Sequence, residues 1–466
     1  MERTSIADLA GKVGEAVSIS GWVDVRRDQG KLIFLDFRDE TGRVQGVVLP
    51  SATDAHEAGS RVRPEWVVRV SGKVNARPER NVKPGELNGA IELEVADIEV
   101  LSEAQTPPFD VRGDGREIGE EVRLSKRYLD LRRPRLQANI RRRAEVALFA
   151  RNFLAAERFV EIETPLLGKA TPEGARDYLV PSRRDPGYVY ALPQAPQQYK
   201  QLLMTAGFER YFQFARCMRD EDTRGDRQPE FTQLDMEMAF VEAEDVISLN
   251  ERLLIALVAA VVPQMRIQQV PFPRFTHAEA MEKFGSDKPD LRESKEDPNL
   301  LAFCWIVDFP FFEKTEKGSW TFTHNPFSAP KPEHMAWLMA GERIGEILTT
   351  QYDIALNGSE IGGGSIRNHT PEALTKVLEI MGSTPEQIQA SFGHMLDAFS
   401  HGAPPHGGIA WGFDRLMTVL CNEPSIREVI AFAKTGEGRD LTTGAPALAT
   451  AEQLRDLGLE RRQGKA

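Results

Sequence analysis

The chain has little cysteine and no long hydrophobic run. Its three cysteines lie too far apart to suggest a disulfide framework: Cys217, Cys304 and Cys421. The longest apolar stretch, residues 253–262, has about half of the ~20 residues that a membrane-spanning helix needs, and a proline follows it. The start of the chain has no apolar signal region. These absences predict a cytoplasmic protein that does not enter a membrane.

Common nucleotide- and zinc-binding signatures are also missing. No Gly-Lys dipeptide is followed by Ser or Thr, as a P-loop requires, and the eight histidines show neither paired cysteines nor HExxH spacing. The sequence therefore predicts no structural zinc site, and a nucleotide would have to be held in another way. The net charge of −12 argues against a protein that coats polyanions. A nucleic acid would have to bind a local basic patch.

Two or three domains are expected from 466 residues, of which 41% are hydrophobic and 27% charged. Short strand-like runs predict a small β-barrel near the N-terminus, and they lie at 17–20, 32–37, 44–49, 67–70 and 91–95. A polar connector rich in proline and glycine, 104–123, predicts a boundary. We therefore expect a five-stranded barrel domain at 1–104, a hinge at 105–135 and a second domain at 136–466.

The second domain begins with a helical pattern. Val146, Phe149, Ala150 and Phe153 recur at helical spacing, and the helix is expected from residue 137 to about 158. A strand at 159–164 follows and stops at Pro165, which cannot donate to a ladder. Further strand-like runs separated by helical stretches lie at 188–192, 211–217, 233–240, 303–308, 353–358 and 407–413. The expected fold is α+β, with an antiparallel sheet flanked by helices.

Three segments carry residues suited to chemistry. Residues 214–237 form a charged loop between two strand-like runs, and Arg219 is its best candidate for stabilising charge on a reacting phosphoryl group, because its fork donates two hydrogen bonds. Phe231, just past that loop, could stack on a base. A solvated, charged hairpin is the alternative for any single arginine. The other two segments are 353–367 and 407–416.

The segment 407–416 is rich in glycine, which lets a ligand approach the backbone, and Arg415 follows where a helix begins. In the segment 353–367, Asp353 and Glu360 could share a divalent cation with a phosphate chain, and Arg367 could bind an acidic ligand. A hairpin with exposed charges is the alternative there.

Together with the helix, strand and proline at 137–165, these segments resemble the motifs of class II aminoacyl-tRNA synthetases: a helix, strand and proline, then a strand-loop-strand with arginine, then a glycine-rich strand and helix ending in arginine. Four stretches are more specifically similar to the bacterial-type aspartyl-tRNA synthetases, and they lie at 171–182, 219–222, 285–290 and 407–415. The resemblance runs from about residue 15 to 450. It implies an N-terminal OB-fold that binds the anticodon, and a homodimer. The implied reaction activates L-aspartate with ATP and Mg²⁺ and transfers it to tRNA(Asp), with tRNA(Asn) left open as a second acceptor.

The resemblance also implies site residues. Arg219 would contact the α-phosphate and Arg415 the γ-phosphate, as the catalytic residues. The rest of the ATP site would be Asp220, Glu221, Gln228, Phe231, Glu360, Gly412, Phe413 and Asp414. Asp353 and Glu360 would hold Mg²⁺. The aspartate site would comprise Glu173, Gln197, Lys200, Arg219, Asp235, His324 and Arg367.

Within that aspartate site, Lys200 and Arg367 would clamp the side-chain carboxylate. Asparagine would leave both cations unpaired, and an unpaired buried charge costs about 3 to 5 kcal/mol. This penalty is the expected source of selectivity.

In the barrel, the resemblance implies anticodon contacts by Arg27, Gln29, Phe34, Gln45, Arg80 and Glu92. Phe34 lies on the opposite face of its run from Ile33 and Leu35, which favours stacking on a base over packing in the core. A local basic patch is expected from Arg26, Arg27, Lys31, Arg38 and Arg43. Relaxed enzymes of the family carry His and Gly at the positions of Gln29 and Arg80, so strict recognition of tRNA(Asp) is favoured here.

The chain departs from the family at three places. The large inserted domain is missing, and only a short stretch near 285–302 remains. Asn325 replaces the second of two paired histidines, and Ala195 replaces a serine, which removes possible substrate contacts.

Three other functions stay open from the sequence. An asparaginyl- or lysyl-tRNA synthetase is disfavoured by Lys200 with Arg367. A non-catalytic RNA-binding paralogue is disfavoured by the complete set of ATP-site residues. An asparagine synthetase on the same catalytic fold is disfavoured by the N-terminal barrel.

Overall fold

The computed structural model describes residues 2–170 and 174–461. The chain divides into two compact units, Met1–Val111 and Arg112–Ala466, which are described separately. Among the described residues, no helix is both long enough and apolar enough to cross a membrane.

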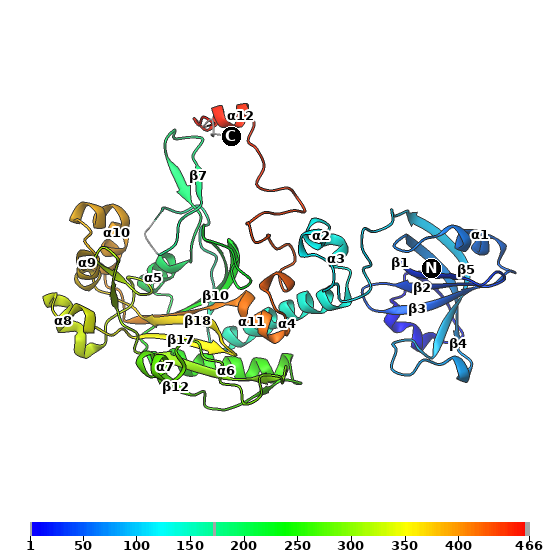
Figure 1. Cartoon of the computed structure of the whole chain (residues 1–466), viewed down its shortest axis with the longest axis horizontal. Helices are drawn as coiled ribbons and strands as arrows, with labels where there is room; N and C mark the ends of the chain where they lie inside the picture. The colour runs from blue at the N-terminus through cyan, green and yellow to red at the C-terminus, as the bar shows by residue number, and fades with distance from the viewer. Residues whose placement is uncertain (1, 171–173, 462–466) are drawn as a thin grey trace. The chain divides into compact units, whose positions relative to one another are not determined.

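The first unit is a closed five-stranded barrel, as expected from the strand-like runs (Figure 1). Its strands are β1 (Ala16–Asp28), β2 (Ile33–Arg38), β3 (Arg43–Val48), β4 (Val67–Ala76) and β5 (Ile91–Ser102). They pair in the order β1-β2-β3-β5-β4, and β4 pairs with β1 to close the barrel. Alternate side chains such as Ile33, Leu35 and Phe37 fill the interior. One helix, α1 (Thr53–Arg61), which the sequence reading did not predict, lies between β3 and β4.

The second unit is built on an eight-stranded sheet in the order β12-β14-β17-β18-β19-β10-β9-β6. The strands are β6 (Val160–Glu161), β9 (Arg210–Met218), β10 (Glu230–Ala239), β12 (Arg274–Thr276), β14 (Phe303–Val307), β17 (Gln351–Leu356), β18 (Ser359–Ile366) and β19 (His406–Gly412). The expected antiparallel pairing is confirmed for the inner strands. Only the two edge pairs, β12 with β14 and β6 with β9, are parallel.

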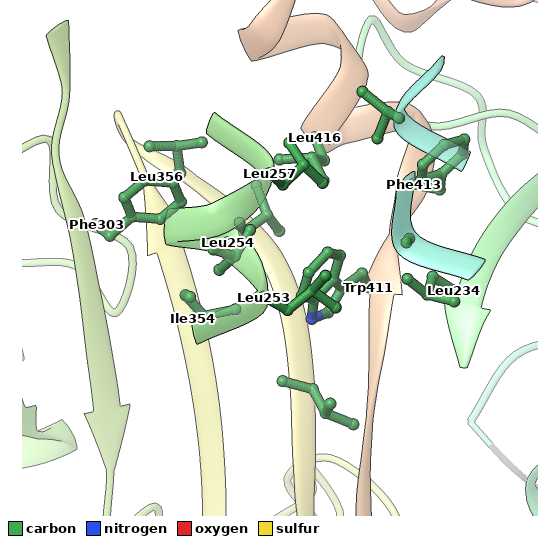
Figure 2. Close-up of a cluster of buried hydrophobic side chains, with 14 of the residues drawn as sticks. Leu234, Leu253, Leu254, Leu257, Phe303, Ile354, Leu356, Trp411, Phe413 and Leu416 are labelled. Carbon is green, nitrogen blue, oxygen red and sulfur yellow. The ribbon is translucent and has the colours of Figure 1, made fainter. Parts of the chain in front are cut away.

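Helices cover one face of this sheet. They are α4 (Pro134–Ala156), α6 (Ala243–Val261) and α11 (Phe413–Leu420). In Figure 2, Leu253, Leu254 and Leu257 of α6 pack against Ile354 of β17 and Trp411 of β19. The apolar run noted in the sequence is therefore the buried side of a core helix.

The first motif differs in detail from the expectation. The helix starts at Pro134, earlier than expected, because proline is favoured in the first turn, where its missing N–H costs nothing. The following strand has only two residues, Val160 and Glu161, which pair with β9 at the edge of the sheet.

The remaining elements surround the sheet. The helices are α2 (Glu120–Ser125), α3 (Arg127–Asp130), α5 (Gln197–Thr205), α7 (His277–Phe284), α8 (Met335–Ala340), α9 (Pro371–Ile380), α10 (Pro385–Ser400) and α12 (Ala451–Asp456). The short strands are β7 (Leu179–Pro181), β8 (Val189–Ala191), β11 (Arg266–Ile267), β13 (Leu300–Leu301), β15 (Phe312–Lys314) and β16 (Trp320–Phe322).

Buried ion pairs fasten α2 and the start of α4 to the chain that follows α11. Arg123 Nη2 lies 2.8 Å from Glu428 Oε1, and Arg135 Nη2 lies 2.9 Å from Glu428 Oε2. Burial opposes the charge on Glu428, but the hydrogen bond and charge of Arg123, together with Arg135, lower its pKa to about 2. The ionised carboxylate therefore stabilises the folded state.

Replacement of Glu428 by glutamine is expected to lower the free energy of unfolding by about 3 kcal/mol at pH 7, because Arg123 and Arg135 each lose one of their two carboxylate partners and keep only Asp130 and Glu423, respectively. The pKa of Glu428 falls on folding, so its contribution is complete above the ordinary carboxyl value of 4.5 and disappears as the pH falls towards 2. Denaturant unfolding of both proteins from pH 7 to pH 3 measures this difference, which should shrink at low pH. The matched control is Glu437→Gln at an exposed ion pair, where little change is expected.

Candidate active site

A cavity of about 490 Å³ lies over the sheet, within the size range of small-molecule sites. Most of the site residues expected from the sequence line it: Gln197, Arg219, Glu221, Gln228, Phe231, Asp235, His324, Asp353, Glu360, Gly412, Asp414 and Arg415. Asp353 faces the cavity because neighbouring strand residues alternate, and Ile354 faces α6. Glu173 lies outside the described residues.

Glycines on β18 and β19 make room for carboxylates. A Cβ atom at Gly363 would lie 2.7 Å from Asp353 Oδ1, and one at Gly408 would lie 2.1 Å from Glu237 Oε2. Both distances are too short for a side chain. The sequence suggested that the glycines of the segment 407–416 admit a ligand. The structure adds that Gly408 of this segment, and Gly363 on β18, are needed to accommodate the protein's own acidic groups.

Two arginines face the cavity without strong ion pairs. The guanidinium of Arg219 lies 5.1 Å from the ring centre of Phe231, and its Nε donates to the Gln194 carbonyl at 3.4 Å. Arg415 lies 3.8 Å from Glu360 Oε2 and 3.4 Å from Asp226 Oδ2. These contacts are longer than strong charge-assisted hydrogen bonds, so both groups can bind an anion.

Asp353, Glu360 and His324 form an acidic centre in the same cavity. His324 Nε2 lies 3.5 Å from Asp353 Oδ2. Although 44% of the Glu360 side chain is exposed, desolvation by the cavity wall raises its pKa, and the charge of Asp353 adds to the rise. Desolvation opposes the charge on His324, but Asp353 outweighs it and raises the pKa of His324. The negative charges of Asp353 and Glu360 are only partly balanced by His324 and Arg415, which lie at 3.5 and 3.8 Å, and such a pair of carboxylates suits a divalent cation.

A buried cluster of four charges lies beside the acidic centre. Lys200 Nζ is 2.6 Å from Asp235 Oδ1 and 3.1 Å from Glu237 Oε2. Arg367 Nε is 2.9 Å from Glu237 Oε1. The two cations lie close together, since they share Glu237, but neither is among the described residues that line the cavity.

The expectation that Lys200 and Arg367 are unpaired without aspartate is therefore wrong. The sequence showed two cations, and it did not show that Asp235 and Glu237 neutralise both. Burial raises the pKa of Asp235 in spite of Lys200, whereas Arg367 and Lys200 overcome burial and hold the pKa of Glu237 at about 2. The cluster is neutral when both acids are ionised, so asparagine would leave no cation unpaired.

Asp235 offers an acceptor to the cavity. Its Oδ2 atom is buried and, among the described residues, has no hydrogen-bond partner. A buried polar atom without a partner costs free energy, and a ligand ammonium would remove that cost. Gln197 lies nearby on α5, where its side-chain amide donates to Gln201 Oε1 at 3.0 Å.

The structure places some expected ATP-site side chains away from the cavity. Phe413 is 2% exposed and packs edge-to-face on Phe214, and Figure 2 shows it within the cluster of buried hydrophobic side chains. The strand ends at Gly412, and the first helical residue turns inward. Asp220 points outward, 3.9 Å from Arg176, and is not among the described lining residues.

Two other expected ATP-site residues buttress the cavity wall. Gln228 bonds the backbone of Lys434 with both ends of its amide, at 3.2 and 2.8 Å. Asp414 accepts from Arg143 at 2.5 Å and from the backbone N–H of Thr232 at 2.9 Å. Their side-chain atoms are already engaged, so these residues hold the wall in place.

The barrel carries the expected anticodon residues on adjacent strands. Arg27 of β1 lies opposite Phe34 of β2. Gln45 lies on β3, which pairs with β2, and Glu92 lies on β5, which pairs with β3. Phe34 is half-buried and outside the core cluster that holds Ile33. Gln29 lies in the turn after β1, and Arg80 in the helical turn Glu79–Asn81.

The expected basic patch is reduced by ion pairs. Arg38 is 9% exposed and lies 2.9 Å from Asp24 and 2.5 Å from Glu65, so its inclusion in a surface patch was wrong. Alternation along β2 predicts that Arg38 points outward, but its ion pairs with the buried carboxylates of Asp24 and Glu65 hold it inside. Arg27 is also paired, with Asp36 at 2.9 Å.

Sequence reasoning missed two residues at the site. Glu237 lies two positions after Asp235 in a strand with few other charges, which is a detectable signal for a shared face. Gln351 lies two positions before Asp353 and lines the cavity. An amide carries no charge to attract notice in a sequence.

Comparison with known proteins agrees with this architecture. The model of the family described as tRNA synthetases class II (D, K and N) matches residues 119–436, and that of an OB-fold nucleic acid binding domain matches residues 17–101. The chain is 40% identical to the aspartate–tRNA(Asp/Asn) ligase of Acidothermus cellulolyticus, over 96% of this chain and 95% of the relative. It is 39% identical to the aspartate–tRNA(Asp) ligase of Deinococcus radiodurans, over 99% of both chains.

The chain is shorter than these relatives. The two alignments span 570 and 582 positions, whereas this chain has 466 residues. The difference agrees with the expected loss of an inserted domain.

Solved structures show the same fold. The asparaginyl-tRNA synthetase of Pyrococcus horikoshii, complexed with asparaginyl-adenylate, gives a TM-score of 0.75 at 23% identity and covers 93% of this chain and 98% of its own. The aspartyl tRNA synthetase of Entamoeba histolytica gives 0.72 at 23% identity, over 93% and 91%. With a family match over more than half of its length and close relatives along nearly all of it, the chain belongs to the class II tRNA synthetases of the D, K and N group.

Proposed function

We propose that this protein is an aspartate–tRNA ligase, which uses ATP to form aspartyl-adenylate and transfers the aspartyl group to the 3′ end of tRNA(Asp). The proposal depends on one observation: residues suited to a nucleotide and residues suited to an amino acid meet at the same cavity. Arg219, Arg415 and the Asp353–Glu360 pair suit a nucleotide triphosphate, and the unpartnered oxygen of Asp235 beside Lys200 suits an amino acid. The names of the relatives support the same activity.

The chain's own residues would act by positioning and by stabilising charge. An aspartate carboxylate would attack the α-phosphorus in line, and pyrophosphate would leave. The terminal ribose hydroxyl of tRNA would then take the aspartyl group from the adenylate. Arg219 would bind charge that develops at the α-phosphate, and Arg415 would bind the far end of the triphosphate. No side chain needs to act as a nucleophile.

Mg²⁺ fits the acidic centre. Asp353 and Glu360 supply carboxylate oxygens, and Mg²⁺ usually combines one or two carboxylates with substrate phosphates and water. When bound, the ion would neutralise charge on the phosphate chain.

The barrel, within residues 1–104, would bind the anticodon, and residues 136–466 would form the catalytic domain, joined by the hinge 105–135. Phe34 would stack on an unpaired base, which is worth about 1 to 3 kcal/mol. Arg27, Gln45 and Glu92 would contact the neighbouring bases or backbone. Gln29 and Arg80 favour tRNA(Asp) over tRNA(Asn).

We also propose a homodimer through the first motif. Strand β6 is the last in the sheet order, and apolar side chains of the first motif are exposed: Leu148 on α4, Val160 on β6, and Leu166 and Leu167 after it. A second copy that covered this edge would remove them from water. Sedimentation at twice the chain mass would agree with this assembly.

The function is tested by aminoacylation with purified transcripts. tRNA(Asp) and tRNA(Asn) are each incubated with ATP, Mg²⁺ and either aspartate or asparagine. We expect aspartylation of tRNA(Asp) and none with asparagine. Asparaginylation, or the absence of any charging, would contradict the proposal, and efficient aspartylation of tRNA(Asn) would show relaxed recognition.

A further inference from the structure

A continuous chain of buried hydrogen bonds joins the acidic centre to the four-charge cluster. Gln351 Nε2 donates to Asp353 Oδ1 at 2.6 Å, and Gln351 Oε1 accepts from Ser328 Oγ at 3.2 Å. Ser328 Oγ lies 2.9 Å from Ser365 Oγ, and Arg367 Nη1 donates to Ser365 Oγ at 2.9 Å. These five residues are at most 5% exposed. Each link is within hydrogen-bond distance.

The two serines lie between the ends of this chain. Ser365 Oγ accepts from Arg367, which has only N–H donors, and from Ser328 Oγ. Ser328 Oγ has a single proton and lies within hydrogen-bond distance of three acceptors, Ser365 Oγ, Gln351 Oε1 and Asn325 Oδ1. The Gln351 amide donates to the Asp353 carboxylate. Gln351 is therefore held in a buried polar network between a guanidinium cation and a carboxylate anion.

The strand register explains why Gln351 reaches both ends. On β17, Gln351 and Asp353 are two positions apart and share a face, and they lie opposite Ser365 and Gly363 of β18. A Cβ atom at Gly363 would lie 2.7 Å from Asp353 Oδ1 and 3.4 Å from Gln351 Nε2. The glycine therefore clears the space in which the amide meets the carboxylate.

We propose that Gln351 is a positioning residue for the divalent cation, because it fixes the carboxylate of Asp353 through this hydrogen-bond chain. The proposal rests on the proposed function, which places Mg²⁺ at Asp353 and Glu360. With Oδ1 engaged by the amide, the second oxygen of Asp353 faces His324 and the cavity. Residues that orient metal ligands in this way typically change metal affinity about 10- to 100-fold when replaced.

The test compares the wild type with Gln351→Leu, which keeps a similar volume and removes the amide. Calorimetric titration with ATP is done in excess Mg²⁺ and again in EDTA. We expect the affinity for ATP with Mg²⁺ to fall about 10- to 100-fold, and the affinity in EDTA to stay unchanged. In pyrophosphate exchange, the half-saturating Mg²⁺ concentration should rise by a similar factor, with little change in KM for aspartate. An equal loss with and without Mg²⁺, or no loss, would overturn the proposal.

A second variant and a control keep the outcome clear. Ser328→Ala removes only the hydroxyl that holds Gln351, and a Mg²⁺-dependent loss of about two- to tenfold is expected. It serves as the test if Gln351→Leu does not fold. Gln268→Leu also removes two side-chain hydrogen bonds, in a loop, and should leave Mg²⁺ dependence unchanged. A wild type without aspartate-dependent exchange would refute the proposed function, whereas the ATP titration tests Gln351 independently.

Discussion

Replacement of Arg219 by alanine is expected to reduce aspartate-dependent pyrophosphate exchange by about 10²- to 10³-fold, close to the limit of detection. Exchange requires attack at the α-phosphorus, and Arg219 is the guanidinium at the cavity that makes no ion pair among the described residues, with only Phe231 and a carbonyl near it. Its charge is therefore available to the reacting group, and the loss of one such donor costs about 10² to 10³ in kcat. Exchange of labelled pyrophosphate into ATP measures the effect.

The matched control for Arg219 lies on the same strand. Arg216 points to the surface, where it pairs with Glu230 at 2.8 Å and donates to Thr232. Its replacement by alanine should leave exchange within a few-fold of the wild type, because exposed ion pairs contribute little. If Arg219→Ala kept exchange at the level of Arg216→Ala, the role of Arg219 at the α-phosphate would be rejected. Thermal unfolding of both variants excludes loss of the fold.

The elements that follow from periodicity were predicted well. All five barrel strands and the inner strands of the large sheet agree with their sequence patterns, and so does the outward position of Phe34. Alternation along a strand depends on local geometry alone, so one sequence is enough to find it. Edge strands are harder, because their direction depends on partners far away in the chain, and two parallel edge pairs were missed for this reason.

The sequence predicted which residues form the site, but it predicted less well which charged groups surround them. Arg219, Asp353 and Arg415 reach the cavity as expected: Arg219 directly follows β9, Asp353 lies within β17, and Arg415 lies in the first turn of α11. The pairing of Lys200 and Arg367 was not foreseen, because strand order brings Glu237 to Arg367, 130 positions away. Phe413 was misplaced because one residue at a strand–helix junction decides which way a side chain points.

Replacement of Lys200 by methionine is expected to abolish aspartate activation and to lower the free energy of unfolding by about 3 to 5 kcal/mol. Methionine has a similar length and no charge, so Asp235 and Glu237 are left with Arg367 alone. Burial already raises the pKa of Asp235, and Lys200 is the main group that opposes this rise. Without Lys200, Asp235 would take up a proton. An aspartate side chain would then meet one cation fewer beside a buried acid. Exchange at saturating aspartate and denaturant unfolding measure the two effects.

A double variant separates binding from stability. Lys200→Met with Asp235→Asn removes one charge of each sign, so the buried cluster is neutral again, and most of the lost stability should return. Aspartate activation should stay absent, because neither the cation nor the free oxygen of Asp235 is restored. Recovery of exchange together with stability would mean that Lys200 only balances Asp235 and does not bind the substrate. Recovery of stability alone would assign the pair Lys200 and Asp235 to the aspartate site.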